Sequence, residues 1–285
     1  MTVMAVNTLP GLALPAGEAI PVLGQGTWHL GQGRHTRAEE TRALQVGIEL
    51  GMTLIDTAEM YGDGASEELI GEAIAPRRPE VFLVSKVLPS HATRQGTAAA
   101  CRASLARLGT DHLDLYLLHW PGMIPLEQTL AGFEDLRSTG LIRHWGVSNF
   151  DRGDLERLMR LPGGDAAQTD QVLYNLSRRA IEGSLLPWSL EQPLPIMAYS
   201  PLDQGRLLEH PVVRGIAGEH RASPAQVALA WVLAHPGVCA VAEAGTVGHV
   251  HENRAAADLQ LSELDMLKLD DAFPPPVGPQ PLEVL

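Results

Sequence analysis

Residues 51–71 read Gly-Met-Thr-Leu-Ile-Asp-Thr-Ala-Glu-Met-Tyr-Gly-Asp-Gly-Ala-Ser-Glu-Glu-Leu-Ile-Gly. The short apolar run Thr53–Ile55 predicts a β-strand that ends at Asp56. Tyr61 follows on a loop framed by glycines, and the residues Ser66–Ala75 predict a helix. The stretch therefore encodes a strand, a loop and a helix, with an acid and a phenol between the two regular elements.

The same alternation of strand and helix recurs before and after this stretch. The expected strands are Gly24–Trp28, Thr53–Asp56, Val81–Lys86, Leu113–His119, Ile142–Val147, Ala167–Leu173, Pro195–Tyr199 and Val238–Ala242. The expected helices are Thr36–Leu50, Ser66–Ala75, His91–Leu108, Leu126–Ser138, Asp151–Arg160, Ser223–Ala234 and His249–Ala257, with a less regular segment around Leu185–Leu190. Nearly continuous apolar strands that alternate with helices predict a parallel sheet covered by helices.

Eight such units in 285 residues predict an α/β fold, a (β/α)8 barrel of the TIM type, rather than an open doubly wound sheet. The open sheet is further disfavoured because no G-x-G-x-x-G motif opens a strand–helix unit. A short N-terminal β-hairpin is expected within Thr8–Leu23, and an extra C-terminal helix opens at Ser262. No linker or low-complexity block interrupts the pattern, so residues 1–285 are interpreted as one domain.

Composition and charge argue against nucleic-acid-binding and membrane-spanning proteins. The net charge of −13 argues against nucleic-acid binding, and no apolar run reaches the roughly 18 residues that a membrane helix needs. The segment Met1–Leu14 lacks a basic start and a cleavage signature, and Cys101 and Cys239 suggest neither a disulfide framework nor a metal site. We therefore expect a cytoplasmic protein. The sequence does not fix the oligomeric state, for which a monomer or a weak oligomer is expected.

Polar side chains end three successive strands. Asp56, Lys86 and His119 lie at the C-terminal ends of the second, third and fourth expected strands, and Tyr61 lies just beyond the second. In this barrel the C-terminal face carries active sites. Each residue alone also fits a structural role as a turn, core or hydrogen-bonded residue. Together they favour a site, because a lysine that ends an apolar strand needs a counter-ion and Asp56 supplies one.

These residue types suit the reduction of a carbonyl group. A phenol has an ordinary pKa of about 10, and a nearby ammonium such as that of Lys86 is expected to lower the pKa of Tyr61. His119 can hydrogen-bond a carbonyl oxygen, while Tyr61 donates a proton to it. The hydride must come from a cofactor, because no side chain provides one.

The runs Gly51–Gly71, Leu105–Pro121, Gly146–Phe150 and Ala198–Leu202 resemble the aldo-keto reductases, and the resemblance covers nearly the whole chain. It implies that Asp56, Tyr61, Lys86 and His119 form the family's catalytic tetrad. Tyr61 would be the general acid of this tetrad.

By the same resemblance, NADPH or NADH is the expected cofactor. Ser148, Asn149 and Gln171 would hold the carboxamide of the nicotinamide, and Tyr199 would stack on its ring. The other residues expected at the cofactor are Gly26, Thr27, Trp28, Asp56, Ser200, Leu202, Gln204, Gly205, Arg206, Glu243, Thr246, His249, Glu252 and Asn253. Alternatively, Ser148 and Asn149 cap the next helix, and Tyr199 is a plain core residue.

The sequence departs from the family where the 2′-phosphate of NADPH is usually held. Many relatives have Lys at the position of Glu243 and Arg at that of His249. Two unit charges about 4 Å apart interact by roughly 4 kcal/mol at an effective dielectric near 20, before exposure and salt reduce the value. Glu243 therefore predicts a weakened preference for NADPH, with NADH usable. The alternative is that Glu243 points into solvent and NADPH is held by backbone and helix-terminus contacts.

The substrate is expected to be a small carbonyl compound. The segments after His119 and Phe273 are short, which predicts an open pocket lined by Trp28, Trp120 and Tyr61, with His119 at its base. The pattern is similar to bacterial members that reduce small aldehydes and α-dicarbonyls such as methylglyoxal.

Two other classes compete with this interpretation. One is a cofactor-sensing binding protein, which the intact tetrad disfavours. The other is a metal-dependent barrel hydrolase or isomerase, for which His119 alone does not make a ligand cluster.

Overall fold

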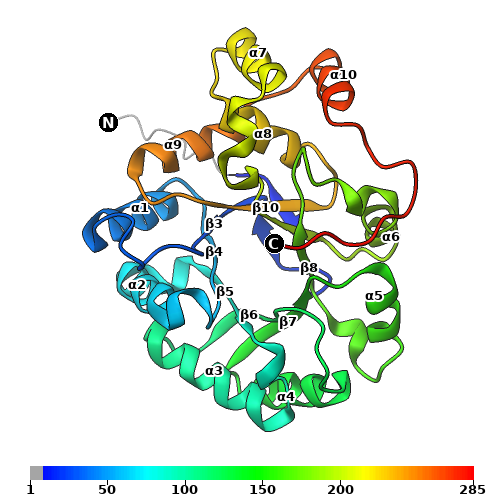
Figure 1. Cartoon of the computed structure of the whole chain (residues 1–285). Helices are drawn as coiled ribbons and strands as arrows, with labels where there is room; N and C mark the ends of the chain where they lie inside the picture. Colours follow the sequence, from blue (N-terminus) through cyan, green and yellow to red (C-terminus); the bar gives the residue numbers. More distant parts are fainter. Residues whose placement is uncertain (1–8) are drawn as a thin grey trace.

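The computed structural model describes residues 9–285 and contains a closed barrel of eight parallel strands (Figure 1). The strands are β3 (Leu23–Gly26), β4 (Leu54–Asp56), β5 (Phe82–Val87), β6 (Leu113–Leu118), β7 (Ile142–Ser148), β8 (Asp170–Leu173), β9 (Ile196–Tyr199) and β10 (Val238–Glu243). They pair in chain order, and β10 closes the ring by pairing with β3. The expected (β/α)8 barrel is confirmed.

Helices surround the barrel in Figure 1. They are α1 (Arg37–Glu49), α2 (Ala65–Ile74), α3 (Arg94–Leu108), α4 (Leu126–Ser138), α5 (Arg152–Met159), α6 (Leu185–Glu191), α7 (Pro211–His220), α8 (Pro224–Leu233), α9 (Val247–Ala256) and α10 (Glu263–Ala272). The expected extra C-terminal helix is α10, and Ser262 caps it. Within residues 9–285, no helix has the length and apolar character needed to cross a membrane.

The structure corrects the sequence prediction between β8 and α8. The segment expected to be less regular contains the seven-residue helix α6, and α7 was not predicted at all. Gly215 and Gly218 weaken the helical propensity of α7. Its stability comes from tertiary packing, because Val213, Ile216 and Ala217 form a buried stripe at helical spacing.

The barrel strands present alternate residues to two cores. On β6, Leu115 and Leu117 belong to the interior cluster, whereas Tyr116 and Leu118 pack in the larger cluster with residues of the surrounding helices. This period of two residues fixes which side chains enter the barrel. A polar residue two positions after an inward-facing apolar residue therefore points toward the barrel mouth.

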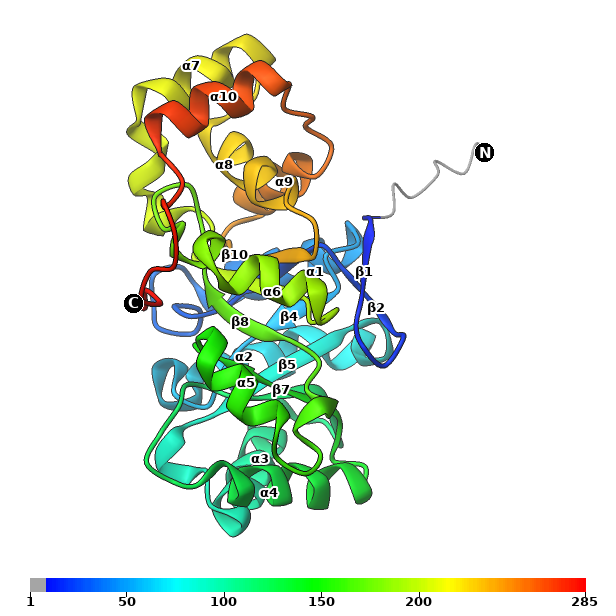
Figure 2. The ribbon, with the colours of Figure 1, turned by 90° about the vertical axis from the view of Figure 1, so that its right-hand side faces the viewer.

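The expected N-terminal hairpin consists of β1 (Gly11–Ala13) and β2 (Ala19–Pro21). Its expected first residue, Thr8, lies outside the described residues. Leu14 and Ile20 of the hairpin join the interior cluster. In Figure 2 the hairpin and the C-terminus lie on opposite sides of the barrel. The hairpin therefore closes the N-terminal end and leaves the other end open to ligands.

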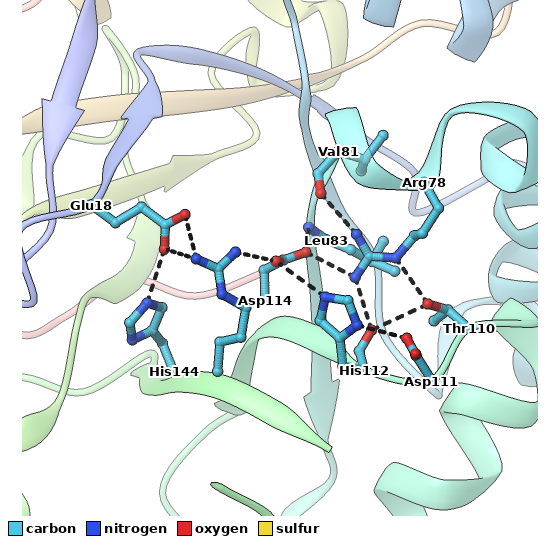
Figure 3. Close-up of polar contacts among 10 residues, drawn as sticks. Glu18, Arg78, Val81, Leu83, Thr110, Asp111, His112, Asp114 and His144 are labelled. Atoms are coloured by element: carbon cyan, nitrogen blue, oxygen red, sulfur yellow. Dashed lines mark hydrogen bonds and ion pairs between the residues drawn. The ribbon is translucent and has the colours of Figure 1, made fainter. Parts of the chain in front are cut away.

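Asp114 is the centre of a polar network at this closed end (Figure 3). The Asp114 carboxylate is buried, accepts a hydrogen bond from the Leu83 N–H at 2.8 Å, and contacts guanidinium nitrogens of Arg78 at 2.9 Å and Arg143 at 2.7 Å. Arg143 also bonds Glu18 of the hairpin at 2.7 Å. One buried carboxylate thus links the segment before β5, strands β6 and β7, and the hairpin.

Replacing Asp114 by Asn is expected to lower the free energy of unfolding by about 2–4 kcal/mol, because two guanidinium groups lose a buried counter-charge. Urea denaturation measures this loss. Asp111→Asn is the matched control, since the Asp111 side chain is exposed and its contact is with the neighbouring His112. Equal unfolding midpoints for the two variants would contradict the role given to Asp114.

Candidate active site

Asp56, Lys86 and His119 come together at the C-terminal mouth of the barrel. Asp56 and Lys86 each lie two positions after an inward-facing residue, Leu54 and Val84 respectively, and His119 follows the end of β6 with the same alternation. Lys86 Nζ donates to Asp56 Oδ2 at 2.9 Å and to the Thr57 carbonyl at 2.8 Å. The predicted counter-ion of Lys86 is confirmed.

Tyr61 reaches the same point from the loop after β4. Lys86 Nζ lies 3.2 Å from the Tyr61 hydroxyl. The chain turns sharply behind the ring, where Gly62 has φ 56°, Asp63 51° and Gly64 95°. Glycine adopts this left-handed backbone without a steric cost, which explains the glycines that frame Tyr61. The loop therefore returns the phenol over the ammonium group.

The pKa of Tyr61 is shifted upward, whereas the sequence analysis predicted a downward shift. Withdrawal from solvent raises the pKa of Tyr61 well above its ordinary value, and the Asp56 and Glu243 carboxylates act in the same direction. Burial also lowers the pKa of Lys86, an effect that Asp56 opposes. Burial outweighs the ammonium, so Tyr61 keeps its proton over the whole physiological pH range.

His119 is a buried neutral imidazole. Burial lowers the pKa of His119 to about 2, and the charge of Lys86 adds to this effect. Its ring lies 5.9 Å from the Tyr61 ring, centroid to centroid, in an edge-on arrangement. Among the described residues, Nδ1 of His119 has no hydrogen-bond partner. The imidazole can therefore donate a hydrogen bond from one nitrogen without carrying a charge.

A hydrogen-bonded network joins the residues expected at the nicotinamide. Gln171 Nε2 donates to Asp56 Oδ1 at 2.8 Å, and the Ser148 hydroxyl donates to the Gln171 carbonyl at 2.8 Å. The Tyr199 hydroxyl donates to Asn149 Oδ1 at 3.0 Å. The residues predicted to hold the carboxamide are therefore assembled at the mouth and connected to the ion pair.

A groove of about 740 Å³ opens beside this network. Its lining includes the expected residues Gly26, Thr27, Trp28, Asp56, Tyr61, Tyr199, Ser200, Leu202, Gln204, Gly205, Glu243 and His249. Ser200 and Gln204 have φ of 49° and 56°, a strained backbone that occurs preferentially at ligand sites. The residues fit a nicotinamide dinucleotide, because aromatic rings, the Gln204 amide and glycine-containing turns line one continuous groove.

Seven expected cofactor residues lie outside the lining of this groove: Ser148, Asn149 and Gln171 of the network above, and Arg206, Thr246, Glu252 and Asn253. The Arg206 guanidinium bonds Gln204 Oε1 at 2.7 Å within its own turn, and the Thr246 hydroxyl caps α9 by accepting from the His249 N–H. Glu252 is half-buried on α9, and Asn253 is buried beside it.

Two polar groove residues were missed by the sequence prediction, besides the apolar Pro201, Val241 and Ala242. His29 and Arg34 lie on the loop between β3 and α1 and line the groove together with Glu243. Loops that follow barrel strands on the C-terminal face build the active sites of this fold, and this rule is the signal that would have found them.

The C-terminal tail reaches the rim of the mouth (Figure 1). Glu283 forms an ion pair with Arg178 at 2.8 Å. The predicted pocket walls Trp28 and Trp120 remain 38% exposed. The short tail thus forms part of the rim and leaves both tryptophans accessible.

The neutral state of His119 makes a prediction about acid stability. In the folded protein His119 stays unprotonated, whereas in the unfolded chain it binds a proton below a pH of about 6.5, so stability falls as the pH falls. Between about pH 7 and about pH 5 the wild type should lose about 2 kcal/mol more free energy of unfolding than His119→Gln. Urea denaturation at both pH values measures this difference, with exposed His251→Gln as the control. Parallel losses in wild type and His119→Gln would refute it.

Comparisons with known proteins agree with this geometry. The model of the Aldo/keto reductase family matches residues 22–273. A methylglyoxal reductase of Escherichia coli is 51% identical over 272 residues, which cover 94% of this chain and 96% of that protein. A glyoxal reductase of Bacillus subtilis is 36% identical over 276 residues, which cover 94% of this chain and 95% of that protein.

A solved structure supports the same relationship. The aldo/keto reductase from Klebsiella pneumoniae in complex with NADP and acetate is 44% identical in sequence. Its structure superposes with a TM-score of 0.94, covering 98% of this chain and 100% of that chain. The chain therefore belongs to the aldo-keto reductase family and is an NAD(P)H-dependent oxidoreductase that reduces carbonyl groups.

Proposed function

We propose that this protein reduces small α-oxoaldehydes of the methylglyoxal type, with Tyr61 as the proton donor. The observation that carries the assignment of Tyr61 is its 3.2 Å contact with Lys86 Nζ in a mouth where Asp56 fixes the ammonium group. The names of two relatives, methylglyoxal reductase and glyoxal reductase, support the substrate class.

The roles of the four residues follow from their contacts. The bound reduced nicotinamide supplies a hydride to the carbonyl carbon. As the carbonyl π bond breaks and its electron pair moves to oxygen, Tyr61 transfers its hydroxyl proton to that oxygen, which gives the alcohol and a phenolate. Lys86 stabilises this phenolate, and its lowered pKa makes it a better donor for returning a proton.

His119 positions the carbonyl before the transfer. Its neutral imidazole lies next to Tyr61, so it can donate a hydrogen bond to the same oxygen. A neutral donor does not compete with Tyr61 for the role of acid, since an imidazole N–H is much less acidic than an imidazolium. This division leaves one proton donor and one orienting group at the oxygen.

The cysteines support a reducing compartment. Cys101 and Cys239 are both free and buried in the structure. Free thiols are typical of cytosolic proteins, and we place the enzyme in the cytoplasm on this ground.

Tyr61→Phe is expected to lower kcat for methylglyoxal reduction by about 10²- to 10⁴-fold, because the phenol is the acid of the reaction. The dissociation constant of the cofactor, measured by fluorescence titration, should change little. Tyr116→Phe is the matched control, since the buried Tyr116 hydroxyl has no hydrogen-bond partner among the described residues. Retained turnover in Tyr61→Phe would remove Tyr61 from the role of donor. Cofactor binding without turnover of any aldehyde by the wild type would favour a cofactor-sensing protein.

The substrate class is tested by comparing kcat/KM for methylglyoxal and glyoxal with that for larger aromatic aldehydes. The α-oxoaldehydes should be preferred by about tenfold or more, because an adjacent carbonyl makes the reacting carbon more electrophilic and a small substrate fits between Trp28 and Trp120. A preference for the aromatic aldehydes would overturn this assignment while leaving the carbonyl chemistry intact.

A further inference from the structure

Glu243 has partners that the sequence did not predict. Its carboxylate accepts a hydrogen bond from the His29 N–H at 2.9 Å and lies 3.2 Å from His29 Nδ1. The His29 ring in turn stacks on Trp28, with the ring centroids 4.4 Å apart. The carboxylate that was expected to face the cofactor is therefore held by the loop between β3 and α1.

This loop also packs against the loop between β10 and α9. The His35 ring lies so close to Gly245 that a Cβ added there would come within 2.4 Å of His35 Cδ2. Thr27, Trp28, His29 and Arg34 of the first loop line the groove, as do Glu243 and His249 of the second segment. The contact between His29 and Glu243 joins the two segments.

Arg34 lies on the same loop as His29, between β3 and α1. It lines the same groove as Glu243 and His249, and its side chain is exposed. Within residues 9–285, no ion pair or hydrogen bond engages the Arg34 guanidinium. By contrast Arg37, three residues later, forms a two-pronged contact with Glu72 at 2.7 Å.

Among the described residues Arg102, Arg160 and Arg221 also lack an ion pair, but of these four arginines only Arg34 lines the groove, on a chain with a net charge of −13. A guanidinium group presents paired N–H donors that match the oxygens of a phosphate monoester. His249 lines the same groove and can add a donor. The groove thus carries an unpaired anion-binding group as well as a carboxylate that His29 already engages.

We propose that Arg34, together with His249, binds the 2′-phosphate of NADPH, while His29 holds the Glu243 carboxylate away from it. The inference rests on the proposed use of this groove by the nicotinamide cofactor. It places the phosphate-binding positive charge on the loop after the first barrel strand, and not at the end of β10, where the family resemblance led us to expect a Lys. It reverses the sequence prediction, because NADPH should then bind at least as tightly as NADH.

Binding of the cofactor and its fragments tests the proposal without any turnover. Isothermal titration of the wild type with NADPH, NADH, 2′,5′-ADP and 5′-AMP should show tighter binding of each compound that carries a 2′-phosphate. Arg34→Gln should raise the dissociation constants of NADPH and 2′,5′-ADP by about tenfold or more, because a charge-assisted contact is lost. The dissociation constants of NADH and 5′-AMP should stay within about twofold, since neither compound reaches Arg34 with a phosphate.

Arg37→Gln is the matched control. It removes the same charge three residues away, on a side chain that Glu72 already engages. It should leave all four dissociation constants within about twofold, since exposed charges farther apart than a Debye length of about 8 Å are largely screened at physiological salt. Equal effects of Arg34→Gln and Arg37→Gln on NADPH would overturn the proposal in favour of a general field effect.

His29→Phe tests the second half of the proposal. The substitution keeps an aromatic ring against Trp28 and removes the Nδ1 contact with Glu243. NADPH binding should weaken several-fold while NADH binding does not, and adding Glu243→Gln should restore NADPH binding, as a double-mutant cycle would show. Unchanged NADPH binding in His29→Phe would refute the role of His29.

The outcomes also separate this inference from the proposed function. Tighter binding of NADH than of NADPH by the wild type, or an equal effect of Arg34→Gln on both dinucleotides, overturns the role of Arg34 and leaves the carbonyl chemistry of Tyr61 untouched. Binding of neither dinucleotide overturns the proposed function itself.

Discussion

Asp56 and Lys86 hold opposite charges 2.8 Å apart in the barrel mouth, where the Lys86 side chain is fully withdrawn from solvent. Burying an ion pair is unfavourable unless each charge also finds polar partners. Lys86 bonds the Thr57 carbonyl and the Tyr61 hydroxyl, and Asp56 accepts from Gln171. The pair therefore requires the C-terminal ends of β4, β5 and β8 to lie at the same height along the barrel axis. The positions of Tyr61 and Gln171 consequently depend on the register of the barrel strands.

The loops around this pair adopt backbone conformations that a flexible chain would avoid. Asp63, Asn149, Ser200 and Gln204 all have positive φ, and each lies just beyond the C-terminal end of a barrel strand. Such residues persist only where the surrounding structure determines them. At the opposite end, Asp114 and the hairpin are joined by ion pairs through Arg143. Stability and ligand binding are thus concentrated at opposite ends of the same strands.

In the barrel mouth, the effect of a charged side chain depends more on the groups that contact it than on its residue type. The same Lys86 that stabilises a phenolate cannot lower the pKa of the free Tyr61, because withdrawal from solvent and the Asp56 carboxylate raise it. Glu243, an acid where the family resemblance led us to expect a base, is engaged by His29 of a loop more than 200 residues earlier in the chain. The effect of one charged residue on a bound ligand therefore cannot be deduced from the sequence until the groups that contact this residue are known.

The sequence by itself determined the eight-stranded barrel and the set Asp56, Tyr61, Lys86 and His119. Strand periodicity and residue order are local properties, and they already place these side chains at the ends of successive strands. Only the tertiary structure decided the helix α7, the pKa of Tyr61 and the contact between His29 and Glu243. The physical reason is that packing, desolvation and ion pairing depend on residues distant in sequence, which only the closed barrel brings together.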